Sequence, residues 1–193
     1  MATVPQPYLS PQQYLAYERM AEFKSQYFQG EMFAMAGESR EHNLIVANIV
    51  RELGNSLKHR PCEVYPSDMR VKVTTSGLYT YPDATVVCSE AKFEDDQFDT
   101  LINPTVLFEV LSDSTESFDR GGKFRLYREI DSLKEYVMVS QDRASVECYL
   151  RQSDDRWLLK ETQSLEESVT IESLEVTVPL AELYRNIRFE IVP

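Results

Sequence analysis

The order of helical and extended segments predicts a single α/β domain with a mixed β-sheet. Two observations carry this prediction. An amphipathic helical segment at 41–58 precedes several short apolar segments, and a second helical segment at 118–130 separates these from further strands. The length of 193 residues fits one ordinary domain, which can bury a core without a disulfide or a structural metal.

The N-terminal part predicts a helix followed by a hairpin. Ser10 precedes Pro11 as a helix cap precedes a first-turn proline, and apolar residues continue to about Phe23. Residues 27–36 then form two short apolar runs split by Gly30, which is typical of a hairpin. The helix at 41–58 is the most clearly amphipathic segment of the chain.

Strands follow this helix. Segments 62–65 and 69–74 are separated by a turn-like break, and the second alternates apolar with charged residues, as a half-buried strand does. Segments 84–88 and 105–111 are more continuously apolar, which indicates central strands covered on both faces. The acidic stretch 90–103 between them is expected to be a solvated loop.

The C-terminal half returns to helical spacing at 118–130, where Gly121 and Gly122 weaken the first turn. A strand at 135–140 and a hairpin from 144–150 and 156–161 come next. Two further short strands at 169–171 and 176–178 lead to a short helix at 180–184.

The charge of the chain is unevenly distributed. The net charge is -12, but residues 90–119 carry -8 and residues 161–193 carry -5, whereas 40–72 and 120–160 are each +2. This balance excludes a protein that coats nucleic acid or an anionic membrane through bulk charge. Cys62, Cys88 and Cys148 are far apart and odd in number, so we expect reduced thiols and no zinc knuckle.

Several common active sites are excluded by missing motifs. The sequence has no glycine-rich dinucleotide or P-loop motif and no G-x-S-x-G elbow, and its two histidines cannot form a three-histidine zinc site. Residues 1–10 do not resemble a secretory signal, and no apolar run approaches the roughly 20 residues of a membrane span. We therefore expect a soluble, cytoplasmic protein whose chemistry rests on carboxylates, lysine and a hard cation.

Three charged residues stand out in this framework. Asp83 immediately precedes one apolar strand, and Glu109 lies inside the other, where a carboxylate is costly unless it is paired or binds a metal. On adjacent strands the two acids would converge on one hard cation such as Mg²⁺. Lys123, on the following helix, could reach the same point to orient a water or to neutralise phosphate charge.

These residues resemble the motif of the PD-(D/E)XK nuclease superfamily. Pro82-Asp83 and then Glu109-Val110-Leu111 match it, except that Leu111 replaces the usual lysine. In one branch this lysine has moved to the next helix, and FEVLSDSTESFDRGGKFRLYREI resembles that branch, with Lys123 as the migrated lysine. The segments GEMFAMAG, YPSDMRV, YPDATVVC and LKEYVMVSQD match as well. Over nearly the whole chain, the sequence resembles the Uma-type restriction endonuclease family, which is abundant in cyanobacteria.

The resemblance implies a restriction-endonuclease-like core, with a central mixed sheet flanked by helices and additional β-hairpins. One domain would span 1–193, with an N-terminal helix and hairpin at 1–38, the nuclease core at 39–141, and a C-terminal hairpin and tail at 142–193. It also implies that Asp83, Glu109 and the Val110 carbonyl bind Mg²⁺ or Mn²⁺, as one ion or two, and that Lys123 assists the attacking water.

Structural roles remain open beside these catalytic ones. Asp83 could cap a turn, and Lys123 could pair with Asp119 on an exposed face. A second tier of candidate residues could serve the site or the scaffold: Glu31 in the hairpin, His42 at the helix start and Asp68 in a turn. A third set could touch phosphate or form a solvated face: Arg120, Arg125 and Arg128.

The sequence thus supports a Mg²⁺-dependent DNA endonuclease that acts as a homodimer, since cutting both strands at once needs two sites. The alternative is a degenerate nuclease-fold protein that binds nucleic acid or a protein partner without cleaving it. Duplex DNA, single-stranded DNA and RNA remain open as substrates, as does another phosphodiester.

Overall fold

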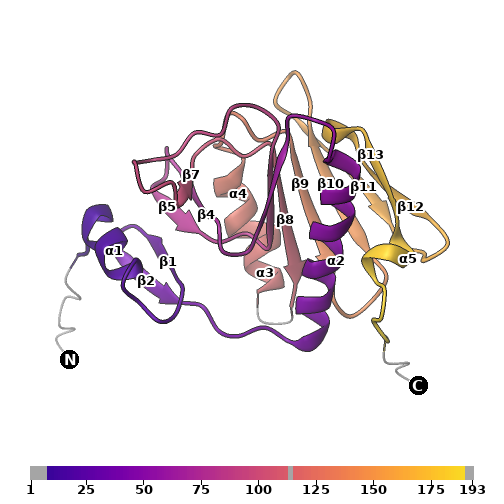
Figure 1. Cartoon of the computed structure of the whole chain (residues 1–193), viewed down its shortest axis with the longest axis horizontal. Coiled ribbons are helices and arrows are strands. Elements are labelled where there is room, and N and C mark those ends of the chain that lie inside the picture. The colour runs from indigo at the N-terminus through magenta and orange to yellow at the C-terminus, as the bar shows by residue number, and fades with distance from the viewer. Residues whose placement is uncertain (1–7, 113–114, 190–193) are drawn as a thin grey trace.

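The computed structural model describes residues 8–112 and 115–189, which form helices on both sides of a large sheet beside a smaller one (Figure 1). The elements, in chain order, are α1 (Pro11–Glu18), β1 (Ser25–Phe28), β2 (Glu31–Ala34), α2 (Arg40–Leu57), β3 (Glu63–Pro66), β4 (Arg70–Val73), β5 (Leu78–Thr80), β6 (Ala84–Val87), β7 (Thr100–Leu101), β8 (Val106–Leu111), α3 (Glu116–Phe118), the π-helical turn η1 (Asp119–Lys123), α4 (Phe124–Tyr127), β9 (Glu135–Ser140), β10 (Val146–Arg151), β11 (Trp157–Thr162), β12 (Ser168–Ile171), the 3₁₀ turn η2 (Glu172–Leu174), β13 (Val176–Pro179) and α5 (Leu180–Leu183). The predicted mixed α/β architecture is therefore confirmed. Residues 1–7, on which the expectation about a secretory signal largely rests, lie outside the described residues.

The large sheet has six strands in the order β11-β10-β9-β8-β6-β3, and only its β8–β9 pair is parallel. Because side chains alternate along a strand, β8 sends Val106, Phe108 and Val110 to one face. There they pack with α2, α5 and the separate β12–β13 ribbon. Leu107 and Leu111 point to the other face, which α4 covers. The central strands are thus covered on both faces, as their sequences predict.

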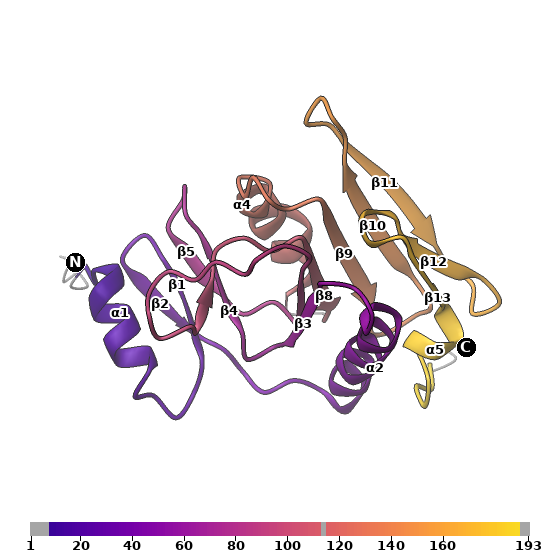
Figure 2. The same ribbon diagram turned by 45° about the horizontal axis from the view of Figure 1, so that its top comes forward.

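The small sheet has the order β2-β1-β5-β4-β7 and carries the N-terminal helix (Figure 2). Tyr14 of α1 packs on Tyr27 and Tyr79, with ring centroids 5.0 and 5.3 Å away. Ser10 caps α1 in a full capping box with Gln13, as expected, although α1 ends at Glu18 rather than near Phe23.

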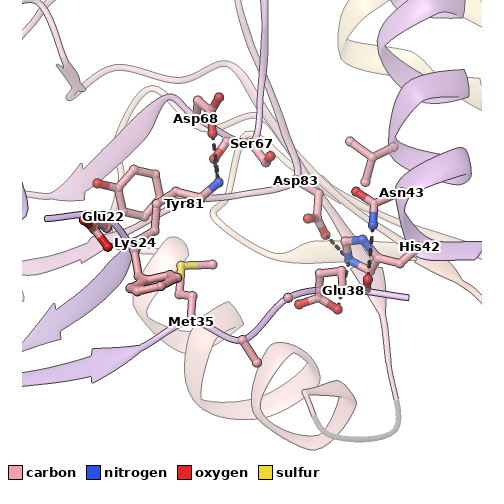
Figure 3. Close-up of a pocket in the computed structure, with 14 residues that line it drawn as sticks. Glu22, Lys24, Met35, Glu38, His42, Asn43, Ser67, Asp68, Tyr81 and Asp83 are labelled. Carbon is pink, nitrogen blue, oxygen red and sulfur yellow. Dashed lines mark hydrogen bonds and ion pairs between the residues drawn. The ribbon is translucent and has the colours of Figure 1, made fainter. Parts of the chain in front are cut away.

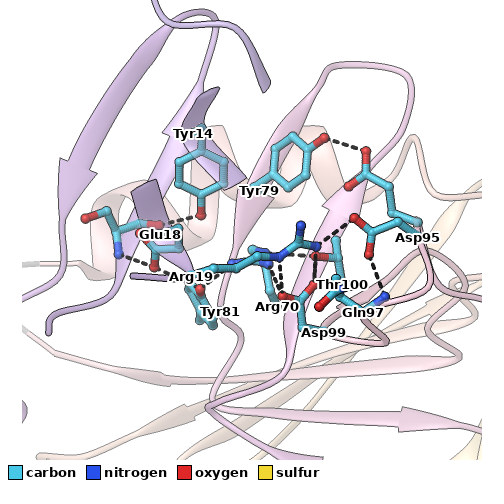
Figure 4. Close-up of polar contacts among 12 residues, drawn as sticks. Tyr14, Glu18, Arg19, Arg70, Tyr79, Tyr81, Asp95, Gln97, Asp99 and Thr100 are labelled. Atoms are coloured by element: carbon cyan, nitrogen blue, oxygen red, sulfur yellow. Dashed lines mark hydrogen bonds and ion pairs between the residues drawn. The ribbon is translucent and has the colours of Figure 1, made fainter. Parts of the chain in front are cut away.

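The acidic segment 90–103 is largely the loop that its composition suggests, but several of its carboxylates are paired rather than solvated. Asp99 forms ion pairs with Arg19 at 2.7 Å and with Arg70 at 2.9 Å, and Arg19 also pairs with Asp95 at 2.7 Å (Figure 4). This segment also contributes β7, which pairs in parallel with β4. Its carboxylates therefore join α1 to the small sheet.

Two other expectations are corrected. Cys62 and Cys88 form a disulfide, whereas reduced thiols were expected. Glu63 pairs with Val87 in the β3–β6 ladder, so the next positions outward, Cys62 and Cys88, face each other. Cys148, which is buried, is the remaining free cysteine. The predicted helix at 118–130 is shorter and is interrupted by a π-helical turn. Among the described residues, no helix is long and apolar enough to cross a membrane.

Candidate active site

Asp83 and Glu109 lie at the same end of two paired central strands. The antiparallel β6–β8 ladder pairs Ala84 with Phe108; Asp83 immediately precedes β6, and Glu109 follows Phe108 in β8. The Asp83 amide donates to the Phe108 carbonyl at 3.1 Å, and the Asp83 carboxylate accepts from the Val110 amide at 2.7 Å, so Asp83 is held against this part of β8. The negative charge of Asp83 contributes to the raised pKa of Glu109, which shows that the two acids lie close together.

Glu109 is surrounded by polar partners inside the core. Its side chain is only 5% exposed, and its Oε1 lies 2.8 Å from Lys123 Nζ. The hydroxyl of Tyr127 donates to the same oxygen at 2.7 Å. Lys123 also contacts Asp119 Oδ1 at 3.1 Å, so the expected i,i+4 pair exists, but in a buried position rather than on an exposed face. The lysine thus serves Glu109 and Asp119 together.

A π-helical turn brings Lys123 to this position. The turn spans Asp119–Lys123 and continues directly into α4, which carries Tyr127 one turn later. Gly122 permits it, because a Cβ atom there would lie 2.9 Å from the ring of Phe118. π-helical turns of this kind are frequent at functional sites.

Burial dominates the electrostatics of the cluster. It raises the pKa of Glu109 to about 8; Asp119 and Asp83 add to this shift, and Lys123 opposes it. Burial also acts to lower the pKa of Lys123, but the negative charges of Glu109 and Asp119 outweigh it, and that pKa is raised. Lys123 therefore remains an ammonium group at neutral pH.

His42 holds Asp83 from the opposite side. It lies in the first turn of α2, where its amide is capped by Ser39, and its Nε2 is 3.2 Å from Asp83 Oδ2. Burial lowers the pKa of His42, but the bond to Asp83 more than compensates, and a hydrogen bond to the Val110 carbonyl raises it further. Since the Val110 amide also donates to Asp83 at 2.7 Å, these three residues meet at one point. The structure thus places His42 in direct contact with the Asp83 carboxylate.

A cavity of about 450 Å³ opens beside this point (Figure 3). Asp83, His42 and Glu38 lie on one side, and Lys24, Met35 and Tyr81 lie on the other. It thus separates the N-terminal hairpin from the start of α2 and gives solvent access to Asp83.

The remaining candidate residues have different surroundings. Asp68 lines the cavity from the β3–β4 turn and pairs with Lys24 at 2.9 Å. Glu31 is exposed at the start of β2 and does not line this cavity. Arg120 is held by Glu116 at 2.7 Å and Glu147 at 2.5 Å, so its charge is already balanced.

Arg125 and Arg128 are exposed and lie around a separate depression that also includes Trp157. The structure therefore does not bring the three arginines to the acids. Tyr127 and Asp119, which touch the catalytic candidates, were not expected in the site. Their spacing of four residues on either side of Lys123 is the one sequence signal that could have revealed them.

The donor set fits a hard cation. The carboxylates of Asp83 and Glu109 lie close enough to influence each other, beside the Val110 carbonyl, and Mg²⁺ binds such oxygens while retaining several water ligands. No group of three or more His, Cys, Asp or Glu side chains with metal-site geometry occurs in the described ranges, so an ion here would depend on the carbonyl, on water and on substrate oxygens.

Comparisons with known proteins identify the family and the fold of the chain. The chain is 34% identical to the uncharacterized protein slr1290 of Synechocystis sp. (strain PCC 6803), over 97% of both chains. It is 39% identical to sll1609 of the same organism, over 79% of this chain and 86% of that protein. A crystal structure titled as a putative nuclease belonging to DUF820, from Anabaena variabilis, superposes with a TM-score of 0.74 at 16% identity, over 91% of this chain and 97% of that one, which shows a shared fold. The Uma2 family model, described as "Putative restriction endonuclease", matches residues 11–181, and the chain belongs to this family.

Proposed function

We propose that this protein is a Mg²⁺- or Mn²⁺-dependent endonuclease that hydrolyses phosphodiester bonds in DNA. One observation carries the proposal: Asp83, Glu109 and Lys123 come from three separate elements, yet they form one charge cluster at the edge of an apolar core. Buried charge of this kind is expensive to maintain, and perturbed acids next to a cavity are typical of functional sites.

Asp83, Glu109 and the Val110 carbonyl would hold the metal ion. When bound, the ion supplies Lewis-acid activation of the scissile phosphate and makes a water molecule more acidic. His42 and the Val110 amide fix the orientation of Asp83, and Tyr127 fixes that of Glu109. Each acid is thus oriented by a neighbouring group, as metal ligands usually are.

Lys123 supplies the positive charge of the site. Its ammonium lies 2.8 Å from Glu109, so an oxygen of a water or of a phosphate placed beside Glu109 would be within its reach. In that position its N–H groups can donate a hydrogen bond to the oxygen of the attacking water and so orient it, or can stabilise negative charge on the phosphoryl oxygens. Three rotatable N–H donors allow it to do so while keeping one bond to Glu109.

Plasmid nicking tests the proposal. Supercoiled DNA is incubated with the wild-type protein in Mg²⁺, in Mn²⁺ and in EDTA, beside Asp83→Ala and the exposed control Asp154→Ala. We expect nicking by the wild type and by Asp154→Ala only when metal is present, and loss of at least about 100-fold in Asp83→Ala. Equal nicking by Asp83→Ala and the wild type would refute this site.

Absence of cleavage by all proteins, together with binding of labelled DNA, would instead support the alternative of a non-cleaving nucleic-acid-binding protein. The expected homodimer is a separate proposal, because the one catalytic cluster described in each chain could cut only one strand at a time. Light scattering during size-exclusion chromatography, with and without a DNA duplex, measures the oligomeric state directly.

A further inference from the structure

The cavity beside Asp83 has features that the hydrolytic mechanism does not use. Its volume of about 450 Å³ lies within the range of small-molecule sites. Asp83 and His42 occupy only one end, and the rest extends toward the N-terminal hairpin (Figure 3). The cavity therefore has room for a chemical group next to the bond that is cut.

The far wall of the cavity is apolar and partly aromatic. Phe23, Met35 and Tyr81 contribute to it from three different segments. Tyr81 is held firmly, because its hydroxyl donates to Glu18 at 2.8 Å and accepts from the buried Arg70 at 2.8 Å (Figure 4). Because Tyr81 is only 6% exposed and Lys24 Nζ lies 5.5 Å from its ring centroid, its ring forms a fixed part of the wall. The exposed ring of Phe23 beside the Met35 thioether is the surface suited to the flat face of a nucleobase.

The polar groups around the cavity are mainly acceptors. Glu22, Glu38 and Asp68 line it, and ionised carboxylates only accept hydrogen bonds. Lys24 is the only lysine or arginine among the described lining residues, and its ammonium is already bonded to Asp68 at 2.9 Å and to the Ser67 carbonyl at 3.0 Å. Phosphate would be repelled by this lining, whereas an exocyclic amino group of a base would find acceptors.

We propose that this cavity is a nucleobase subsite, which holds the unstacked base of a nucleotide adjacent to the cleaved phosphodiester and prefers bases that carry an exocyclic amino group. The proposal rests on the function proposed above and adds a substrate class to it. A base inside an intact duplex cannot reach such a cavity, so the substrate presents a single-stranded or flipped nucleotide there. Cytosine offers the amino donor, whereas thymine presents a carbonyl acceptor at the same position.

Binding of short homopolymers tests the subsite without knowledge of the cut position. Fluorescence anisotropy in EDTA, and again in Ca²⁺, compares dye-labelled dC12, dT12 and an abasic strand of equal length. We expect dC12 to bind about 10-fold more tightly than dT12, and the abasic strand to bind no better than dT12. Equal affinity for all three strands would overturn the proposal.

Matched variants assign the effect to the cavity. Phe23 is 76% exposed, so Phe23→Ala should fold normally; we expect it to weaken dC12 binding several-fold and to leave abasic binding unchanged. Phe98→Ala, which removes another exposed ring outside the cavity, serves as the control and should change neither. Glu38→Gln and Asp68→Asn should reduce the preference for dC12 over dT12 to about 3-fold or less, since a carboxamide can donate to thymine.

The two proposals can fail separately. Metal-dependent plasmid nicking combined with equal binding of the three strands would leave the nuclease standing and remove the subsite. A preference for dC12 that depends on Phe23, combined with no cleavage of any DNA, would keep the subsite and remove the nuclease. A preference that survives in Phe23→Ala, Glu38→Gln and Asp68→Asn would also overturn the subsite.

Discussion

Replacement of Lys123 by methionine is the most direct test of the buried charge cluster. Among the residues that the structure describes, the ammonium group of Lys123 is the one cation that contacts Glu109 and Asp119, and all three side chains are at most 5% exposed. Methionine has similar length and packs adaptably, so Lys123→Met removes the charge with little change in volume. Both carboxyl groups are then left inside the core without their counterion.

The expected loss of stability is about 3 kcal/mol. Removing one member of a buried ion pair typically costs 3–5 kcal/mol, because the remaining charge has been taken out of water. The lower end applies here, since burial already raises the pKa of Glu109 to about 8 and this carboxyl can take up a proton. For a domain of this length, 3 kcal/mol corresponds to a melting temperature lower by about 6–12 °C.

A triple variant distinguishes charge from packing. When Glu109→Gln and Asp119→Asn are added to Lys123→Met, no uncompensated charge remains, and we expect most of the lost stability to return. The triple variant should remain inactive. Lys160→Met, at an exposed lysine 3.9 Å from its acidic partner, is the matched control and should change stability by less than about 0.5 kcal/mol.

Urea unfolding measured by tryptophan fluorescence provides the assay. The single tryptophan, Trp157, packs against Phe124, with ring centroids 5.3 Å apart. Because Phe124 directly follows Lys123 in the chain, the fluorescence of Trp157 reports on this region. The reasoning is refuted if Lys123→Met lies within about 0.5 kcal/mol of the wild type, or if the triple variant is no more stable than the single one.

Three further predictions concern stability. Arg19, bonded to Asp99, holds the pKa of the Asp99 carboxyl well below its usual value of 3.8. A lowered pKa stabilises the folded state at pH values above 3.8, so Asp99→Asn should cost about 1 kcal/mol at pH 7 in urea unfolding. The difference in stability from the wild type should shrink as the pH falls below about 3.8. Asn48→Ala should cost about 2 kcal/mol by thermal unfolding, since its buried amide donates to two carbonyls at the end of α5, at 2.9 and 3.0 Å. Reduction of the Cys62–Cys88 disulfide, which closes a loop of 26 residues, should cost about 3 kcal/mol, and alkylation in denaturant should label one thiol before reduction and three after it.

Each of these has a clear contrary result. A constant difference between Asp99→Asn and wild type from pH 7 to pH 3 would exclude the ionic origin of the effect. An unchanged melting temperature in Asn48→Ala would show that water satisfies the two carbonyls equally well. Three labelled thiols before reduction would show that the cysteines are not joined.

The sequence predicts best where local signals and burial agree. α2 and β8 were located to within one or two residues, because their patterns match the faces that they bury. β5 and β7 were missed, since strands of three and two residues have no periodicity of their own and form only by pairing with neighbours: β5 with β1 and β4, and β7 with β4. The disulfide was missed for the same reason: its cysteines meet only once the β3–β6 register is known.

The site was predictable only in part. Asp83 and Glu109 were identified because a carboxylate within or next to an apolar strand needs a partner. The π-helical turn left no recognisable trace in the sequence beyond two glycines, so the burial of Lys123 and Asp119 was not foreseen. The cavity was not foreseen either, since its two sides come from the N-terminal hairpin and from α2.

The distribution of charge now has a structural explanation, and it bears on how DNA would bind. Many carboxylates of the acidic block at 90–119 are neutralised by ion pairs within the molecule. Arg19, Arg70 and Lys72 pair with acids of its loop, and Lys123 pairs with Glu109. The same pairing means that these basic groups are not free to neutralise phosphates. Affinity for DNA should therefore come from few ionic contacts. A plot of the logarithm of the binding constant against the logarithm of the salt concentration should have a shallow slope, near about −2 to −3, for contacts to two or three phosphates. A slope steeper than about −6 would require a basic surface that these ion pairs do not leave available.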